Sequence, residues 1–156
     1  DANEPGLSSG LAKIEESVVG LGEYGVGPEN IILLGFSQGA CLAAEYAARN
    51  ARRWGAVAAL TGGLVGDGVA SRDYAGTFDG TPILLGCSDV DPHVPVWRVD
   101  ETEVVLRRLG ARVQKQIYPG LPHIVVRDEL DWVAGMMERL AGTHRRSPAE
   151  VRAGLG

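Results

Sequence analysis

A serine at position 37 lies between two glycines in the stretch Gly35-Phe36-Ser37-Gln38-Gly39, after an apolar run and before an alanine-rich one. A G-x-S-x-G pattern between a buried strand and a helix is typical of a nucleophile held on a sharp, strained turn. The glycines are expected because a side chain at position 35 or 39 would collide with the neighbouring strand or helix. The alternative is that the serine only caps the helix.

A serine hydroxyl is a poor nucleophile until a base takes its proton, and the chain has three histidines. His123 lies in a turn-forming loop after the fourth apolar run, where open α/β sheets place their chemistry. His93 could line the same site but is too near the candidate acid in sequence to be its obvious partner. His144 lies beside two arginines near the end of the chain. We predict His123 as the base, against the alternative of an ordinary loop histidine.

Two aspartates could orient that histidine, because the third apolar run ends in "CSDVDPHVP". Pro92 stiffens the backbone at Asp91, and a rigid loop suits an orienting carboxylate, so Asp91 is the preferred acid. Asp89 is expected to bind loop amides instead. The resulting order along the chain is serine, acid, histidine, which is the order of α/β-hydrolases.

Other residues near these three could bind a substrate. The helix after the serine aims its first amides at the space above the hydroxyl, so the amide of Gln38 could donate to an oxyanion. Val94, Trp97 and Ile124 are candidate walls of an apolar acyl pocket, although ordinary core packing explains them equally well. The histidines and cysteines show no metal-ligand spacing, and we expect no metal and no cofactor.

The pattern of elements predicts an α/β fold with a mostly parallel sheet and helices on both faces. Four short apolar runs are predicted strands: Ile31 to Phe36, Ala56 to Leu60, Pro82 to Cys87 and Arg112 to Tyr118. Helical patterns lie before, between and after them. The segment from Thr61 to Thr81 has no clear period and is long for a loop, which favours a functional role.

Two helices have further sequence signals. Asp100 and Glu103 resemble a capping box at the start of a helix that ends at Gly110. The last helix is predicted to begin near Asp128 and to end before Gly142. Four of its apolar side chains are predicted to face inward: Leu130, Val133, Met137 and Leu140.

The composition fits one domain and excludes several classes of partner. The chain has 156 residues, a formal net charge of −5 and no basic block, so nucleic acid is not an expected partner. No apolar run approaches the ~20 residues that a membrane helix needs. Cys41 and Cys87 lie in apolar contexts and are expected to be free thiols, which favours a cytoplasmic location.

Four stretches together resemble the phospholipase/carboxylesterase family of α/β-hydrolases, which includes bacterial carboxylesterases and acyl-protein thioesterases. They are "GFSQGA", "TGGL", "GCSDVDPHVP" and "YPGLPH", and the resemblance runs from about Asn3 to Gly142. It implies one α/β-hydrolase domain over residues 1–142, followed by a short tail over residues 143–156.

The resemblance also implies roles for individual residues. Ser37 matches the nucleophile, Asp91 the acid, His123 the base, Gln38 the oxyanion amide and Leu64, in "TGGL", a contact in the acyl pocket. The implied reaction is hydrolysis of a small-molecule carboxylic ester or thioester through an acyl-enzyme.

The chain departs from the family pattern at its front. Family members carry earlier strands and a His-Gly-x-Gly loop that supplies a second oxyanion donor, and neither is found before Ile31 here. The amino-terminal strands of the fold are therefore expected to be missing, and the first strand to expose an apolar edge. Loss of one oxyanion donor costs ~10²–10³ in rate, so this chain is expected to be weak or inactive alone. A missing amino-terminal segment or a homodimer would complete the sheet.

Three other functions stay open. One is a hydrolase of cyclic esters that resembles dienelactone hydrolases, although these typically have cysteine where this chain has Ser37, and Cys41 is expected to face the core. A peptidase is less favoured, since nothing indicates a peptide-recognition domain. The third is a non-catalytic fragment that binds a partner through its exposed sheet edge.

Overall fold

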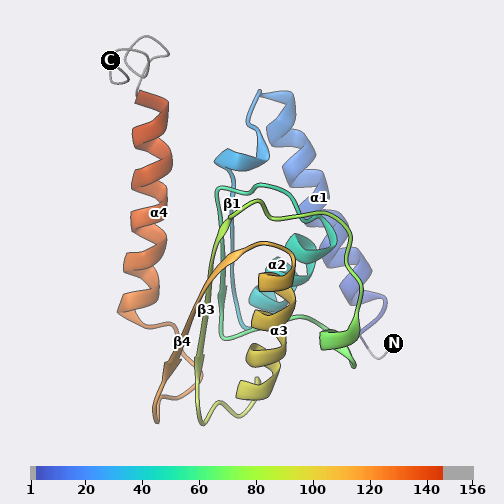
Figure 1. Cartoon of the computed structure of the whole chain (residues 1–156), viewed down its shortest axis with the longest axis vertical. Coiled ribbons are helices and arrows are strands. Elements are labelled where there is room, and N and C mark those ends of the chain that lie inside the picture. The colour runs from blue at the N-terminus through green and yellow to red at the C-terminus, as the bar shows by residue number, and fades with distance from the viewer. Residues whose placement is uncertain (1–2, 146–156) are drawn as a thin grey trace.

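The core of the fold is a four-stranded parallel sheet in the order β1-β2-β3-β4. The computed structural model describes residues 3–145, with side chains described through residue 142. The strands are β1 (Ile32–Phe36), β2 (Ala56–Leu60), β3 (Pro82–Ser88) and β4 (Arg112–Tyr118). Each matches its predicted range to within one residue. Because all strands run the same way, their carboxyl ends meet at one edge of the sheet (Figure 1).

Helices cover both faces of this sheet, as predicted. They are α1 (Gly6–Glu23), α2 (Gln38–Arg49), α3 (Val96–Arg108) and α4 (Arg127–Arg145), with short 3₁₀ turns η1 (Pro28–Asn30) and η2 (Val69–Ser71). Figure 1 shows α1, α2 and α3 on one side of the sheet and α4 alone on the other. Within the described residues, no helix is long and apolar enough to cross a membrane.

The larger hydrophobic core lies between the sheet and the three helices. Four alanines of α2 are completely buried, namely Ala40, Ala44, Ala47 and Ala48. Their small side chains let α2 lie directly against the strands, as the alanine-rich pattern predicted. A smaller cluster on the other face joins Ala58, Leu60 and Leu84 of the sheet to Val133 of α4.

The corner between β1 and α2 is very tightly packed at Gly35. A Cβ atom at this position would lie 2.1 Å from the carbonyl carbon and from the carbonyl oxygen of Gly39. These distances are too short for any side chain to be accommodated. The prediction for position 35 therefore holds. The prediction for position 39 is wrong, because a Cβ atom there would meet nothing within 4 Å. The collision is one-sided: the helix backbone passes over Gly35, whereas Gly39 faces away from the strand.

Two helix predictions need correction. α3 begins at Val96 after Pro95, so Asp100 and Glu103 lie inside the helix and do not form a capping box. Both carboxylates instead bind Lys115 of β4. The predicted end of this helix is correct, since Gly110 has a φ of 83° directly after the last turn.

The buried face of α4 matches the prediction at Val133, and Leu140 is half-buried, but the prediction is wrong at the other two positions. Glu129, Val133 and Met136 are buried, whereas Leu130 and Met137 are exposed. Buried residues four and three positions apart define one helical face, and their next neighbours in sequence turn about 100° away from it. The helix also continues to Arg145, past Gly142, and the rest of the predicted tail lies outside the described residues.

β1 is the last strand on its side of the described sheet. Leu34 points to the α4 face of the sheet and is 50% exposed, and Phe36 is also exposed. The predicted apolar edge is therefore observed in the part of the chain that the structure describes.

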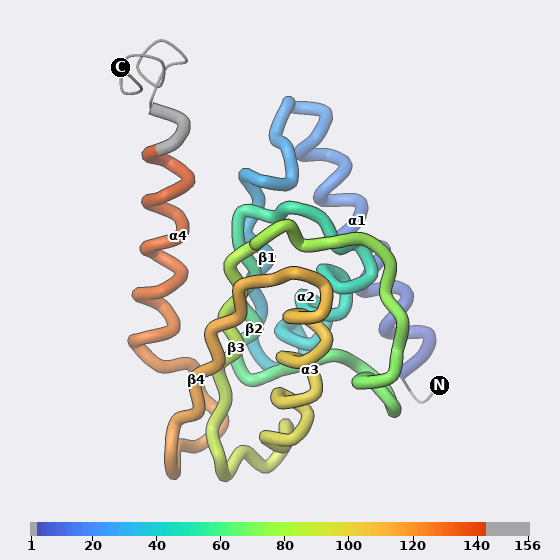
Figure 2. Tube along the Cα trace, in the orientation of Figure 1, coloured from blue at the N-terminus to red at the C-terminus, as the bar shows by residue number. Residues whose placement is uncertain are grey.

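The long segment between β2 and β3 leaves the sheet, passes around the helical layer and returns to the start of β3 (Figure 2). Gly62 lies against α2, where a Cβ atom would be 2.4 Å from the Cβ of Ala40. The amide of Leu64 donates to the hydroxyl of Thr102 in α3 at 2.9 Å. The segment is thus fixed to both neighbouring helices.

The two glycines of the corner give a matched test of the packing. We expect Gly35→Ala to lower the free energy of unfolding by about 3 kcal/mol or more, because the new methyl group overlaps backbone atoms that cannot move independently. Gly39→Ala is expected to leave stability unchanged or raise it by up to about 1 kcal/mol, as Gly-to-Ala changes do in open helical positions. Urea unfolding followed by far-UV circular dichroism measures both, and equal losses would contradict the one-sided collision.

Candidate active site

Ser37 is the residue at the turn between β1 and α2, and its backbone is strained. Its φ is 55°, a region that residues other than glycine rarely adopt. Its amide donates to the carbonyl of Leu60 at 2.9 Å, which fixes the turn to β2. Ser37 occupies the N-cap position of α2, but its side chain makes no capping hydrogen bond. The hydroxyl is therefore available for another partner.

That partner is the imidazole of His123. The Nε2 atom of His123 lies 2.8 Å from the Oγ atom of Ser37. The histidine comes from the loop between β4 and α4, and two rings pack on it: Phe36 with a centroid distance of 4.9 Å and His93 with 4.8 Å. These contacts limit the rotation of the imidazole.

The other ring nitrogen of His123 binds Asp91. Its Nδ1 atom lies 2.6 Å from Oδ2 of the aspartate, whose side chain is fully buried. The Oδ1 atom accepts hydrogen bonds from the amides of His93 and Val94, both at 2.8 Å. Burial opposes ionisation of Asp91 most strongly, but the hydrogen bonds from Val94, His123 and His93 together keep its pKa below the ordinary value. Ser37, His123 and Asp91 thus form one continuous chain of hydrogen bonds.

The acid loop and the histidine loop are joined to each other. Asp89 accepts a hydrogen bond from the amide of Gly120 at 2.7 Å, so it binds a loop amide as predicted. The hydroxyl of Ser88 donates to the carbonyl of Leu121. These two contacts cross from the end of β3 to the loop after β4, and they fix the two loops relative to each other.

Glu129 binds the backbone of the loop that contains His123, near the start of α4. Its carboxylate accepts a hydrogen bond from the amide of Val126 at 2.9 Å, and its side chain lies against Gly86 of β3. Glu129 is almost fully buried. Burial raises the pKa of this carboxyl, and the negative charge of Asp128 adds to the shift, although the Val126 hydrogen bond opposes it.

A cavity of about 440 Å³ reaches the neighbours of this chain of hydrogen bonds: it is lined by Gln38, which follows Ser37, and by His93, which packs on His123. Ser37, His123 and Asp91 are not among its lining residues. Its lining includes Gln38, the first residue of α2, and three of the predicted substrate contacts, Leu64, Val94 and Trp97. The fourth, Ile124, is exposed and does not line the cavity, because it follows His123 on the outer side of the loop.

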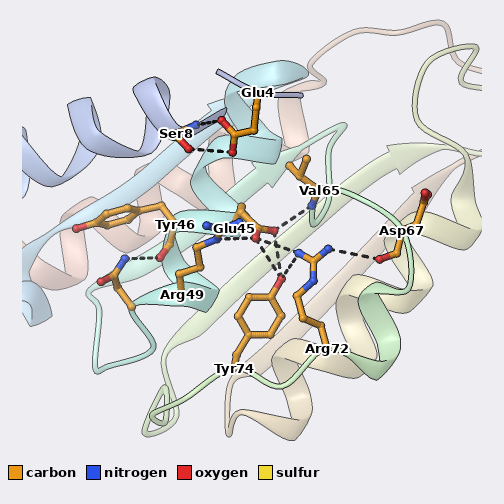
Figure 3. A network of polar contacts seen from close by, with 10 residues as sticks. Glu4, Ser8, Glu45, Tyr46, Arg49, Val65, Asp67, Arg72 and Tyr74 are labelled. Atoms are coloured by element: carbon orange, nitrogen blue, oxygen red, sulfur yellow. Dashed lines mark hydrogen bonds and ion pairs between the residues drawn. The ribbon is translucent and has the colours of Figure 1, made fainter. Parts of the chain in front are cut away.

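A buried carboxylate holds one wall of the cavity. Glu45 of α2 accepts a hydrogen bond from the amide of Val65 at 3.0 Å, next to Leu64. Figure 3 shows Arg49, Arg72 and Tyr74 around the same carboxylate. The segment after β2 is therefore anchored to the helix that begins at Ser37, and the wall keeps its position relative to the hydroxyl.

Both cysteines are free thiols, as predicted. Burial, with the nearby charge of Asp91, raises the pKa of Cys87 to about 11. Cys41 was expected to face the core, but it is half-buried and lines the cavity. Among the side chains of residues 3–142, no three from His, Cys, Asp or Glu are grouped as a metal site.

Two residues of this region were missed by the sequence analysis. Arg98 lines the cavity from the first turn of α3, and Glu45 anchors its wall. A charged residue in an otherwise alanine-rich buried helix was a signal for Glu45. Arg98 gave no signal, because its place depends on where α3 begins.

Solved structures show which class of fold this arrangement belongs to. A phospholipase/carboxylesterase from Dyadobacter fermentans superposes with a TM-score of 0.82 at 43% identity, covering 86% of this chain and 65% of that one. SOBER1 of Arabidopsis thaliana, at 22% identity and a TM-score of 0.71, shares the fold. The predicted α/β-hydrolase fold is therefore confirmed.

Sequence comparison gives the family. Residues 1–140 match the Phospholipase/Carboxylesterase family, and the chain belongs to it. Acyl-protein thioesterase 1 of Saccharomyces cerevisiae is 30% identical over 142 residues, 86% of this chain and 60% of that protein. The same-named protein of Gibberella zeae is 29% identical over 123 residues, 75% of this chain and 51% of that protein. The chain thus spans between half and two thirds of these relatives.

The raised pKa of Glu129 predicts that ionisation of this carboxyl destabilises the folded state as the pH rises. The folded state binds this proton more tightly than the unfolded state, so the contribution to stability is full below the ordinary pKa and is lost as pH rises through the folded value. Glu129→Gln keeps an acceptor for Val126 and cannot ionise. We expect the difference in melting temperature, variant minus parent, to be larger at pH 8 than at pH 5. Each kcal/mol of stability that the parent protein loses over this range should add about 2–4 °C to the difference.

Calorimetry at the two pH values checks this, with Glu138→Gln on the exposed side of α4 as the matched control. The control difference should be the same at both pH values. A Glu129→Gln difference that is constant or falls with pH would show that the buried carboxyl carries no such cost.

Proposed function

We propose that this chain carries the reacting residues of a serine hydrolase that cleaves carboxylic esters or thioesters through an acyl-enzyme. The observation that carries the proposal is the hydrogen-bonded series from Ser37 through His123 to Asp91. Membership of the Phospholipase/Carboxylesterase family supports the same reaction class.

In the first half of the reaction, the Oγ atom of Ser37 attacks the acyl carbon and its proton passes to Nε2 of His123. The carboxylate of Asp91 stabilises the imidazolium that forms and keeps the Nδ1 proton in place. The backbone amide of Gln38, at the start of α2, donates to the oxyanion. The tetrahedral intermediate then collapses, and the alcohol or thiol leaves with the proton from His123.

In the second half, water attacks the acyl-enzyme and His123 takes its proton. The carboxylic acid product leaves, and the proton returns to the oxygen of Ser37. This cycle balances without a cofactor. The acyl group would lie in the cavity, between Leu64, Val94 and Trp97.

The free thiols at Cys41 and Cys87 support a reducing compartment, and we propose a cytoplasmic location.

One observation favours a second candidate function. The exposed edge at Leu34 and Phe36 suits a fragment that pairs with another strand, in the same chain, in a second copy or in a partner. A dienelactone hydrolase-like enzyme is less supported, because Ser37 and not Cys41 is at the corner.

Covalent labelling tests whether Ser37 is a nucleophile. A fluorophosphonate probe is expected to label the purified protein at one site, since a nearby base activates the hydroxyl. Ser37→Ala should abolish labelling, whereas Ser17→Ala, an exposed serine of α1, should not. Intact mass spectrometry reads the adduct. Labelling that persists without the Ser37 hydroxyl would remove it from the mechanism, and no labelling of the parent protein would favour the non-catalytic fragment.

A pair of aspartates tests the orienting role of the acid. Asp91→Asn should lower kcat by about 10⁴-fold, because an amide cannot stabilise the imidazolium and holds the wrong tautomer. Asp89→Asn is the matched control, since an amide oxygen can still accept from Gly120 and the loss should stay within a few-fold. Steady-state kinetics with an activated ester measures both. Losses of similar size would refute a special role for Asp91.

A further inference from the structure

The cavity beside Ser37 has a basic lining in an acidic protein. Arg98 and His93 are among its lining residues, and no aspartate or glutamate of the described chain is. The whole chain has a formal net charge of −5. A pocket that took only neutral acyl chains would gain nothing from a buried cation, because its charge is costly to remove from water.

Arg98 has hydrogen-bonding capacity that the protein does not use. Its side chain is only 15% exposed. The Nη1 atom forms an ion pair with Oε2 of Glu101 at 3.3 Å, and the guanidinium stacks on Trp97 at 4.7 Å. Both atoms of the ion pair are buried but lack hydrogen-bond geometry, so the N–H groups of Arg98 keep their capacity to bind a further acceptor. A guanidinium carries five N–H donors, and most buried donors in proteins are satisfied.

The backbone around the cavity adds to its positive character. Gln38 begins α2, while Trp97 and Arg98 lie in the first turn of α3, and all three line the cavity. The first N–H groups of a helix are unpaired within the helix and carry its partial positive charge. The first turn of α1 also borders the cavity, but Glu4 neutralises it by binding Ser8. Two uncompensated helix starts therefore accompany Arg98.

The rest of the lining is suited to methylene groups. Leu42, Leu64 and Val94 give the cavity apolar walls, and Gln38, which also lines it, follows the proposed nucleophile in sequence. A volume of about 440 Å³ lies within the ~300–1,000 Å³ typical of small-ligand sites. The lining thus combines apolar side chains with a guanidinium that has N–H groups left for a ligand.

We propose that this cavity binds an acyl group that carries its own carboxylate, with Arg98 as the residue that recognises it. The substrate class is then the half-ester or half-thioester of a dicarboxylic acid. This inference rests on the proposed hydrolase function and narrows its substrates. Arg98 does not take part in the chemistry; it selects the acyl group by binding the distal carboxylate.

Two substrates of equal length test the selection. The 4-nitrophenyl half-ester of suberic acid and 4-nitrophenyl octanoate differ only at the far end of the acyl chain, carboxylate against methyl. The parent protein should give a higher kcat/KM with the half-ester. Arg98→Met should lower the ratio of the two kcat/KM values by about 10- to 100-fold, since a hydrogen bond to a charged group is lost.

Two further variants separate charge from folding. Arg98→Lys keeps a cation and should retain part of the preference. Arg127→Met removes an equal charge from an exposed residue of α4 that does not line the cavity, and it should leave the ratio unchanged. A ratio that is the same in the parent protein and in Arg98→Met would overturn the proposal, as would an equal change in Arg127→Met.

Binding to the Ser37→Ala variant keeps this test independent of catalysis. Calorimetric titration with methyl hydrogen suberate and methyl octanoate should show tighter binding of the suberate ester, and Arg98→Met in the same background should abolish the difference. Equal or weaker binding of the suberate ester overturns the inference even if neither ester is hydrolysed. If the octanoate ester is hydrolysed as well as the suberate half-ester, the proposed selectivity is wrong but the hydrolase function stands. If the cavity binds the suberate ester selectively but Ser37 is not labelled by fluorophosphonate, the hydrolase function is wrong but the selectivity stands.

Discussion

The close approach of α2 to β1 at Gly35 is the constraint on which the site depends. With no side chain there, the backbone of Gly39 lies within 2.1 Å of where a Cβ would be, and the chain reverses from strand to helix through one residue. That residue, Ser37, takes a φ of 55° and does not use its hydroxyl to cap the helix. The tight corner thus raises the hydroxyl above the sheet and points the start of a helix at the same space.

The parallel sheet then brings the other groups to that corner. β3 and β4 are paired along seven residues, so the loops that follow them start side by side. Hydrogen bonds from Gly120 to Asp89 and from Ser88 to Leu121 join those loops directly. The position of an imidazole above Ser37 therefore results from strand register and from contacts between the loops.

Sequence alone was sufficient for features that local chemistry determines. The buried strands β2 and β3 are nearly continuous apolar runs, and their ranges were predicted to within a residue. The G-x-S-x-G turn and the proline after Asp91 are similarly local. Predictions failed where the partner is distant: Asp100 and Glu103 match a capping box but bind Lys115 on another strand. The cavity lining was predicted only in part, at Leu64, Val94 and Trp97, because the rest needs the relative positions of three helices and the segment after β2.

Glu45 and Arg98 show how a structural charge differs from one that is available to a ligand. Glu45 is fully buried, and its two oxygens are bound by arginines, by a tyrosine hydroxyl and by the amide of Val65. Every part of its acceptor capacity is used to hold the wall. Arg98 is less buried, lines the cavity and has an ion pair with Glu101 that lacks hydrogen-bond geometry. Its N–H groups therefore have capacity that the fold does not use, and a ligand in the cavity can supply the acceptors.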